Sequence, residues 1–286
     1  MDLNTLIELD ELKSINYGGI TPMYLHNDHR YCLPLLYEAQ SQNNVPKPIN
    51  LILFDAHHDL AYPNSELLTK LHQMRLDGFS FEELLLVCKD QLRQDDSDWI
   101  YAGMELGMID NLVSFGVQFD EPDRKPKYED QTGYEHTLHV LCCTPGQLLG
   151  YQGSLSDVAR QNELRSLWNL FQWELVPQEG FQFSNERAKI WLNIDLDCFV
   201  INWQDYLFPW PDEVFVDRFE IPSDYWSTNG WTGKQFFQKL FETSGLLTIA
   251  REPSYCGGEE KTNEVFNKVN HYLFDNSLQI VAFDGR

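Results

Sequence analysis

The chain has 286 residues, of which 43% are hydrophobic and 14% aromatic, and its formal net charge is −23. This size allows one large α/β domain or two small ones, and we expect a single domain over residues 1–286. The negative charge argues against nucleic-acid binding, which requires clustered Lys and Arg, and it favours a cationic partner.

Membrane insertion and disulfide bonding are both unexpected for this sequence. No stretch reaches the roughly 18 to 20 consecutive apolar residues of a membrane span, and the acidic start "MDLNTLIELDELK" is unlike a targeting peptide. We therefore expect a soluble, cytoplasmic protein. The six cysteines lack CxxC spacing, so we expect reduced packing residues. Composition does not indicate the oligomeric state.

Short β-type runs alternate with helix-like runs along the chain, which predicts a central, mostly parallel sheet flanked by helices. Most of the β-type runs are continuously apolar, as in strands covered on both faces. Capping residues mark two helix starts, at Asn64 or Ser65 and at Ser80, which forms a capping box with Glu83. The expected strands are 49–54, 111–117, 138–143, 189–194, 246–250 and 279–283, and the expected helices are 64–74, 80–89, 156–171, 232–242 and 262–274.

Two segments lack a clear period and are expected to be loops. Residues 118–136 are polar and turn-rich, which indicates a surface loop. Residues 202–231 are aromatic and proline-rich, and loops of that length in a compact domain are usually lids or binding loops.

Acidic residues follow three of the expected strands directly. The strand 49–54 leads into Asp55, His57 and Asp59, the strand 189–194 leads into Asp195 and Asp197, and the strand 246–250 leads into Arg251 and Glu252. Sites in open parallel sheets form just beyond the carboxyl ends of the strands. The three acidic clusters are therefore expected at one edge of the sheet.

So many carboxylates at one edge predict bound cations. Neighbouring carboxylates raise each other's pKa, and a divalent cation relieves that repulsion. Oxygen-rich ligands with imidazole suit Mn²⁺, Fe²⁺ or Mg²⁺, and the set is large enough for two ions roughly 3.5 to 4 Å apart. Either acidic motif alone could be a helix N-cap or a solvated turn. Their joint placement favours the metal centre.

The motifs "FDAHHDL" (54–60) and "NIDLDCF" (193–199) resemble the DAHxD and DxD signatures of the arginase and agmatinase (ureohydrolase) superfamily. The order of "YLHNDH" (24–29), these two motifs and "TIAREP" (248–253) is most similar to the peptide arginases, which convert arginine residues of precursor peptides to ornithine. The resemblance extends over about residues 20–260. It implies a three-layer arginase-like α/β fold with two Mn²⁺ that activate water for urea release.

The resemblance also implies a set of metal ligands. In this set Asp55 and Asp195 bridge the two ions. The remaining ligands form two pairs, His29 with Asp59 for one ion and His57 with Asp197 for the other. His26 is the alternative to His29.

Substrate and proton-transfer residues follow from the same resemblance. Glu252 would bind the guanidinium group, the alternative being a surface carboxylate paired with Arg251. His72 would return a proton to the leaving amine, with His136 and His139 as alternatives.

Two departures from the family concern the substrate and a supporting group. Free-arginine arginases carry an Asn for the substrate α-carboxylate where this chain has Ala61, and a third Asp of many members is Val200 here. An internal arginine of a peptide has no free carboxylate, so we expect an arginine-containing precursor peptide as the partner. The alternatives are an enzyme acting on a small guanidine or an acyl-lysine, and a non-catalytic protein that binds basic peptides.

Overall fold

The structure is a computed structural model that describes residues 12–16, 23–42, 44–93, 95, 97–117, 127–142, 190–203, 206–222 and 231–281. Within these residues, nine strands form one sheet in the order β11-β1-β2-β10-β7-β3-β4-β6-β5. The six strands from β2 to β6 in this order are mutually parallel, whereas β1 and β5 run antiparallel to their neighbours. The strands are β1 (Leu12–Asn16), β2 (Met23–His26), β3 (Ile49–Phe54), β4 (Ile109–Val117), β5 (Lys127–Glu129), β6 (Glu135–Cys142), β7 (Ile190–Asp195), β10 (Ser244–Ala250) and β11 (Gln279–Val281).

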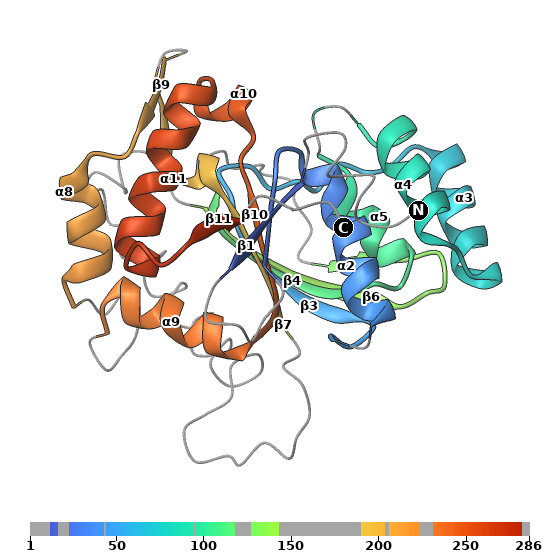
Figure 1. Cartoon of the computed structure of the whole chain (residues 1–286). Helices are drawn as coiled ribbons and strands as arrows, with labels where there is room; N and C mark the ends of the chain where they lie inside the picture. Colours follow the sequence, from blue (N-terminus) through green and yellow to red (C-terminus); the bar gives the residue numbers. More distant parts are fainter. Residues whose placement is uncertain are drawn as a thin grey trace, which may run out of the picture.

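Helices cover both faces of the sheet, which gives three layers (Figure 1). One face carries α2 (Cys32–Ser41), α3 (Ser65–Asp77), α4 (Phe81–Asp90) and α5 (Trp99–Glu105). The other carries α8 (Asp212–Phe215), α9 (Gly233–Thr243) and α11 (Glu259–Phe274). The prediction of an α/β fold with a central, mostly parallel sheet between helices is confirmed.

The central strand β7 explains why these strands read as continuous apolar runs. Ile190, Leu192 and Ile194 are buried in the core on the side of α9 and α11, whereas Trp191 is buried in the core on the side of α2 to α5. Successive side chains point to opposite faces of a strand, so a strand that is covered on both faces is mostly apolar on both. The polar residues of β7 are the buried Asn193 and Asp195 toward its carboxyl end.

The helix starts follow the capping residues. The Asn64 side chain accepts hydrogen bonds from the first turn of α3. Ser80 and Glu83 form the expected capping box of α4, and Thr232 forms a second one at α9. Such caps satisfy backbone N–H groups that have no partner inside the helix.

The two expected loops contain regular structure, so the expectation of irregular backbone there is wrong, whereas the role of 202–231 as a lid or binding segment stays a prediction. The segment 202–231 overlaps a two-stranded sheet of β8 (Val200–Trp203) and β9 (Tyr206–Pro209), followed by α8 and a π-helical turn (Val216–Glu220). The segment 118–136 includes β5 and the start of β6. Strands of three or four residues are too short to display a two-residue period. The expected helix 156–171 lies outside the described residues.

Several short elements were not expected from the sequence, among them α5. Its sequence, "WIYAGME", combines aromatic residues with a glycine, which are weak helix formers. All seven residues are buried, so tertiary packing rather than propensity determines this helix.

The described helices and cysteines can be compared with the expectations for membrane insertion and disulfide bonding. Among the described helices, none has the length and apolar character needed to cross a bilayer. The cysteines at 32, 88, 198 and 256 are buried and free, in agreement with their expected role in packing.

Candidate metal centre

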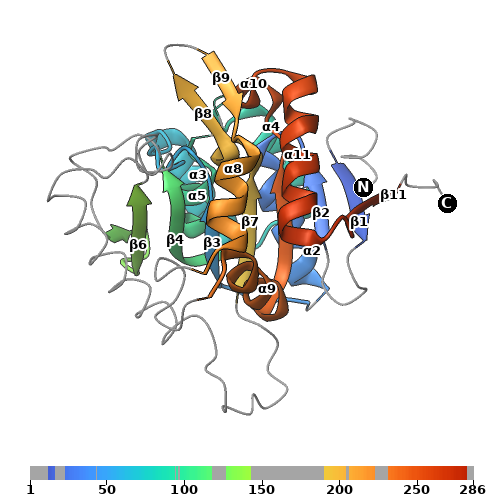
Figure 2. The same cartoon turned by 90° about the vertical axis from the view of Figure 1, so that its left-hand side faces the viewer.

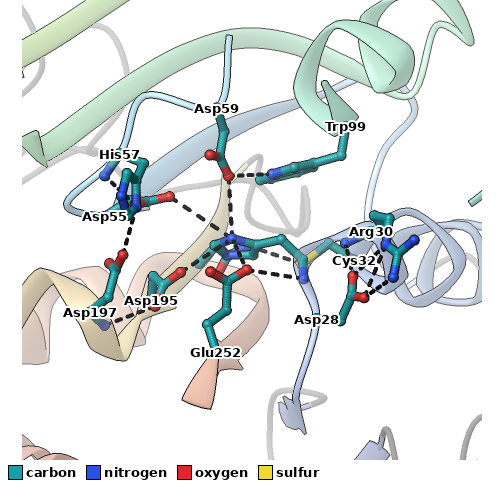
Figure 3. A network of polar contacts seen from close by, with 12 residues as sticks. Asp28, Arg30, Cys32, Asp55, His57, Asp59, Trp99, Asp195, Asp197 and Glu252 are labelled. Atoms are coloured by element: carbon teal, nitrogen blue, oxygen red, sulfur yellow. Dashed lines mark hydrogen bonds and ion pairs between the residues drawn. The ribbon is translucent and has the colours of Figure 1, made fainter. Parts of the chain in front are cut away.

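Four adjacent parallel strands, β2, β10, β7 and β3, end at one edge of the sheet, and each is followed by acidic or histidine residues. After β2, the 3-10 helix η1 (His29–Tyr31) begins. After β7, the 3-10 helix η2 (Leu196–Phe199) begins. Figure 3 shows the side chains from these strand ends pointing toward one another. The converging residues are His29, Asp55, His57, Asp59, Asp195, Asp197 and Glu252.

Backbone hydrogen bonds orient the carboxylates of the two aspartate motifs. Asp55 accepts from the N–H of His57 at 2.6 Å, and Asp195 accepts from the N–H of Asp197 at 2.8 Å, in each case through Oδ1. The N–H of Ala56 donates to Oδ1 of Asp197 at 3.0 Å, which connects the end of β3 to η2. Each local turn therefore uses one oxygen of its aspartate and leaves the other for the centre.

Two of these residues adopt a left-handed backbone conformation, with φ of 49° at Asp59 and 37° at Glu252. This conformation is costly for residues with a Cβ, about 1 to 3 kcal/mol, and it concentrates at functional sites. The N–H of Glu252 donates to the carbonyl of Asn27 at 3.2 Å, and the N–H of His29 donates to Oε1 of Glu252 at 3.4 Å. These contacts hold Glu252 against the residues that follow β2.

His29 lies in the middle of the carboxylates. Its Nδ1 is 3.1 Å from Oε1 of Glu252, 3.3 Å from Oδ2 of both Asp59 and Asp195, and 3.9 Å from Oδ2 of Asp55. Its side chain is 1% exposed. One imidazole thus contacts the ends of β3, β7 and β10.

The second half of the centre is built around His57. Its Nδ1 is 2.7 Å from Oδ2 of Asp197 and 3.7 Å from Oδ1 of Asp55. The His57 side chain is 38% exposed, in contrast to the buried carboxylates. This half therefore faces solvent.

Electrostatic coupling strongly perturbs these groups. Burial raises the pKa of Asp55, Asp195 and Glu252, and neighbouring carboxylates raise the pKa of each further. Burial opposes charge on His29, but Glu252 and Asp195 outweigh it and raise the His29 pKa well above its usual value. Five carboxylates share two imidazoles, so bound cations would relieve the repulsion between the carboxylates.

This donor set fits two divalent cations. Three groups of side chains could each hold an ion, namely His29–Asp55–Asp59, His29–Asp195–Glu252 and Asp55–His57–Asp197. Within the part of the chain that the structure describes, Oδ2 of Asp55 and Oδ2 of Asp195 are buried and accept no hydrogen bond. Buried carboxylate oxygens normally have a partner, and a metal ion supplies one. Asp55 and His29 are each common to two of the groups, whereas Asp195 belongs to one. A carboxylate shared by two groups is expected of a bridging ligand, which favours Asp55 in that role.

A cavity of about 90 Å³ adjoins His57 and Asp197. Its wall includes Asn202 of β8 and Leu207 of β9, together with Tyr255 of α10 (Pro253–Cys256), which follows Glu252. The Tyr255 ring lies 4.9 Å from the His57 ring at an interplanar angle of 61°. Figure 2 shows β8 and β9 beside α10 at one end of the molecule. The cavity thus leads from the short hairpin to the exposed half of the centre.

His26 and His72 belong to none of the three candidate metal groups of the described residues. His26 is held by the carbonyl of Asp28 at 3.1 Å and by Sγ of Cys32 at 3.2 Å, so the geometry favours His29 as the ligand. His72 lies on α3, and no hydrogen bond, ion pair or ring contact of the described residues joins it to the centre. Its catalytic role stays a prediction.

The two alternatives to His72 lie on β6. His136 is near the amino end of this parallel strand, at the edge opposite the metal centre, and its Nδ1 contacts the carbonyl of Asp110 at 2.5 Å. This position does not favour His136 over His72. The side chain of His139 lies outside the described part.

The alternative role for Glu252, a surface carboxylate paired with Arg251, is also wrong. Glu252 is 5% exposed and faces His29. The guanidinium of Arg251 instead contacts Oε2 of Glu259 at 2.5 Å and Oδ1 of Asn27 at 2.9 Å.

Sequence reasoning missed two aromatic residues of this region, Trp99 and Tyr255. Trp99 donates a hydrogen bond to Asp59, and Tyr255 lines the cavity. Tyr255 follows the third acidic motif within a few residues, which could have indicated it. Trp99 lies in the unexpected helix α5, so no local pattern indicated its position.

Comparison with known proteins gives only distant similarities. No protein-family model matches the chain, and no curated protein matches it. The arginase from Medicago truncatula aligns with a TM-score of 0.38 and 13% identity over 89% of this chain and 59% of that one. The agmatine ureohydrolase of Thermoplasma volcanium aligns with a TM-score of 0.35 and 12% identity over 90% of this chain and 64% of that one. The chain thus spans less than two thirds of the length of either protein, and similarities this low carry no conclusion about its activity.

Proposed function

We propose that this protein is a hydrolase with two Mn²⁺ that releases urea from arginine residues of a peptide and leaves ornithine residues. The observation that carries the proposal is the cluster of five buried carboxylates and two imidazoles at the ends of four adjacent strands. These residues would hold two divalent cations, which would supply Lewis acidity and lower the pKa of bound water. The oxygen-rich donor set suits Mn²⁺.

Glu252 and Tyr255 support a guanidinium as the reacting group. A guanidinium is planar, positively charged and a donor of several hydrogen bonds, so carboxylates and aromatic faces complement it. The raised pKa of Glu252 has burial as its main cause. A cation bound beside Glu252 stabilises its ionised form and so offsets the cost of burying the carboxylate.

The size of the cavity favours the end of a side chain over a whole small molecule. At about 90 Å³, it is well below the roughly 300 to 1,000 Å³ of pockets that enclose complete ligands. Ala61 lacks the amide expected for binding the α-carboxylate of free arginine. The exposed rings of Tyr206 and Phe208, on the hairpin beside the cavity, offer apolar surface for residues that flank the arginine. An acidic protein also attracts basic peptides over a distance.

The test is urea release by Mn²⁺-loaded protein incubated separately with free arginine and with arginine-containing peptides. We expect urea and conversion of arginine to ornithine, detected by mass, with the peptides and little turnover of free arginine. The Asp195→Ala variant serves as the control, because the proposed bridging role of Asp195 predicts loss of both ions and of all turnover. Urea from neither substrate overturns the proposal. Fewer than one tightly bound ion per chain would instead favour a non-catalytic, peptide-binding protein.

A further inference from the structure

The indole of Trp99 contacts two of the residues of the centre at once. Its Nε1 donates a hydrogen bond to Oδ2 of Asp59 at 2.7 Å, as Figure 3 shows. Its ring stacks on the imidazole of His29, with centroids 5.3 Å apart and an interplanar angle of 27°. Asp59 and His29 come from different strand ends, so the indole spans the junction between them.

Trp99 is itself held rigidly. It is fully buried, and its ring packs against that of Trp191 at 5.6 Å. Trp191 is fixed in turn by a hydrogen bond from its Nε1 to Oγ1 of Thr248 at 2.8 Å. The N–H of Ala61 donates to the carbonyl of Ser97 at 2.8 Å, which fastens the Asp59 turn to the residues before α5.

We propose that Trp99 is a positioning residue that sets the affinity of one ion of the centre, the ion held by His29 and Asp59. The inference rests on the proposed two-metal centre. The indole N–H occupies one lone pair of Oδ2 and fixes the rotation of the Asp59 carboxylate. The stacked ring restricts the His29 imidazole at the same time. Groups that orient metal ligands in this way typically contribute 10- to 100-fold to metal affinity.

Other contacts orient the ligands in the half of the centre around His57, so Trp99 should affect the affinity of only one ion. Asp197 is oriented by the backbone N–H of Ala56, and His57 has the ring of Tyr255 at its edge. Neither of these supporting contacts involves Trp99. Loss of the indole N–H therefore weakens the binding of one ion and leaves the affinity for the other unchanged.

The test is calorimetric titration of the metal-depleted, full-length protein with Mn²⁺, without substrate. Two replacements are compared with the native chain. Trp99→Phe retains a stacked ring but loses the N–H, and 3-benzothienylalanine at position 99 retains the shape of the indole with sulfur in place of the N–H. We expect one ion to bind with unchanged affinity and the other roughly 10- to 100-fold more weakly in both. The second replacement preserves the core volume, so it decides the question if Trp99→Phe does not fold.

Trp191→Phe is the matched control, because it keeps an aromatic ring packed against Trp99 and removes only the hydrogen bond to Thr248, with no change in a direct contact of Asp59. We expect its two Mn²⁺ affinities to equal those of the native chain. Three outcomes overturn the role of Trp99. They are unchanged Mn²⁺ affinities in the Trp99 replacements, equal weakening of both affinities, and the same loss of affinity in Trp191→Phe. A native chain that binds no Mn²⁺ overturns the metal centre itself, which is a distinct result.

Discussion

Nδ1 of His57 lies 2.7 Å from Oδ2 of Asp197, so a residue that follows β3 and one that follows β7 form a close ion pair. Burial disfavours both charges, but the hydrogen bond between them raises the His57 pKa to about 9 and lowers the Asp197 pKa below its usual value. The pair therefore stays charged at neutral pH in the absence of an ion.

Replacing Asp197 by Asn should lower the pKa of His57 in the metal-free protein. The amide has nearly the shape of the carboxylate but no charge, so the His57 pKa should fall from about 9 toward about 6.5. Titration of the His57 ring by NMR measures the change. Asp212→Asn, at an exposed residue of α8, is the control and should leave the His57 pKa unchanged. A pKa that stays near 9 in Asp197→Asn would contradict the assigned pairing.

Glu252→Gln should separate urea release from metal binding. A hydrogen bond to a charged group contributes about 1.5 to 3 kcal/mol, so kcat/KM for the peptide should fall by roughly 10- to 100-fold. Both Mn²⁺ should remain bound if they occupy the two groups that lack Glu252, His29–Asp55–Asp59 and Asp55–His57–Asp197. Glu259→Gln is the matched control, because the exposed Glu259 pairs with the buried Arg251 rather than with a residue of the centre, and it should change kcat/KM less than about twofold. If Glu252→Gln releases urea as fast as the native chain, Glu252 does not bind the guanidinium. If the variant loses urea release but still hydrolyses acyl-lysine, the protein is a hydrolase of broader specificity.

Gly116→Ala should destabilise the protein through a specific close contact. Gly116 has φ of 94°, and a Cβ there would lie 2.4 Å from Sγ of Cys198 and 3.2 Å from the carbonyl oxygen of Asp55. We expect a loss of unfolding free energy from overpacking, about 1 to 3 kcal/mol, in addition to about 1 to 2 kcal/mol for the backbone conformation. Urea denaturation measures it.

Gly133→Ala is the matched control for that substitution. Gly133 has φ of 80° but nothing within 4 Å of the added Cβ, so only the conformational cost of about 1 to 2 kcal/mol applies. The double variant Gly116→Ala/Cys198→Ala should recover part of the loss, because the sulfur is gone. Equal losses at positions 116 and 133 would show that the contact with Cys198 costs nothing.

Ionisation of Asp130 should make the free energy of unfolding depend on pH in the acidic range. Burial raises its pKa, but hydrogen bonds from Thr132 and the 2.6 Å ion pair with Arg75 outweigh burial and hold the pKa well below its usual value. A carboxylate with a depressed folded-state pKa stabilises the fold fully above its unfolded value of about 3.9, and this contribution is lost as the pH falls toward the folded-state pKa.

Asp130→Asn should therefore be less stable than the native chain by about 1 to 3 kcal/mol near pH 7, with the difference shrinking below about pH 4. Urea denaturation between pH 2 and pH 7, on the order of five points, measures the trend in both proteins. The neighbouring exposed Glu129 provides the control, since Glu129→Gln should change the free energy of unfolding little at pH 7. A difference that is constant with pH would rule out the ionised Asp130 as the source.

The sheet and much of the candidate site could be predicted because both depend on local patterns. The apolar run 49–54 matches β3 in full, and Asp55 follows it at the carboxyl edge. The same rule places Asp195 and Glu252 at that edge, since β7 and β10 are parallel to β3. An apolar run in the sequence, combined with the rule that sites form at the carboxyl ends of parallel strands, is therefore enough to place these residues in the site.

The remaining features depend on long-range packing, which a local pattern does not contain. Trp99 reaches Asp59 only because α5, a helix of weak helix formers, is fully buried. The hairpin beside the cavity is made of two four-residue strands that have no distinctive period. His26 and His29 could not be distinguished until the turn after β2 had directed one imidazole toward Cys32 and the other toward the carboxylates.

The strand order β2-β10-β7-β3 brings together residues from the beginning, middle and end of the chain. An unfolded chain cannot present these ligands together, so Mn²⁺ would bind the native state alone and stabilise it by mass action. The ions would then act as a cross-link between four strands that are distant along the chain. Resistance to proteolysis would rise with the concentration of free Mn²⁺ and fall in chelator, so protein turnover would follow metal supply.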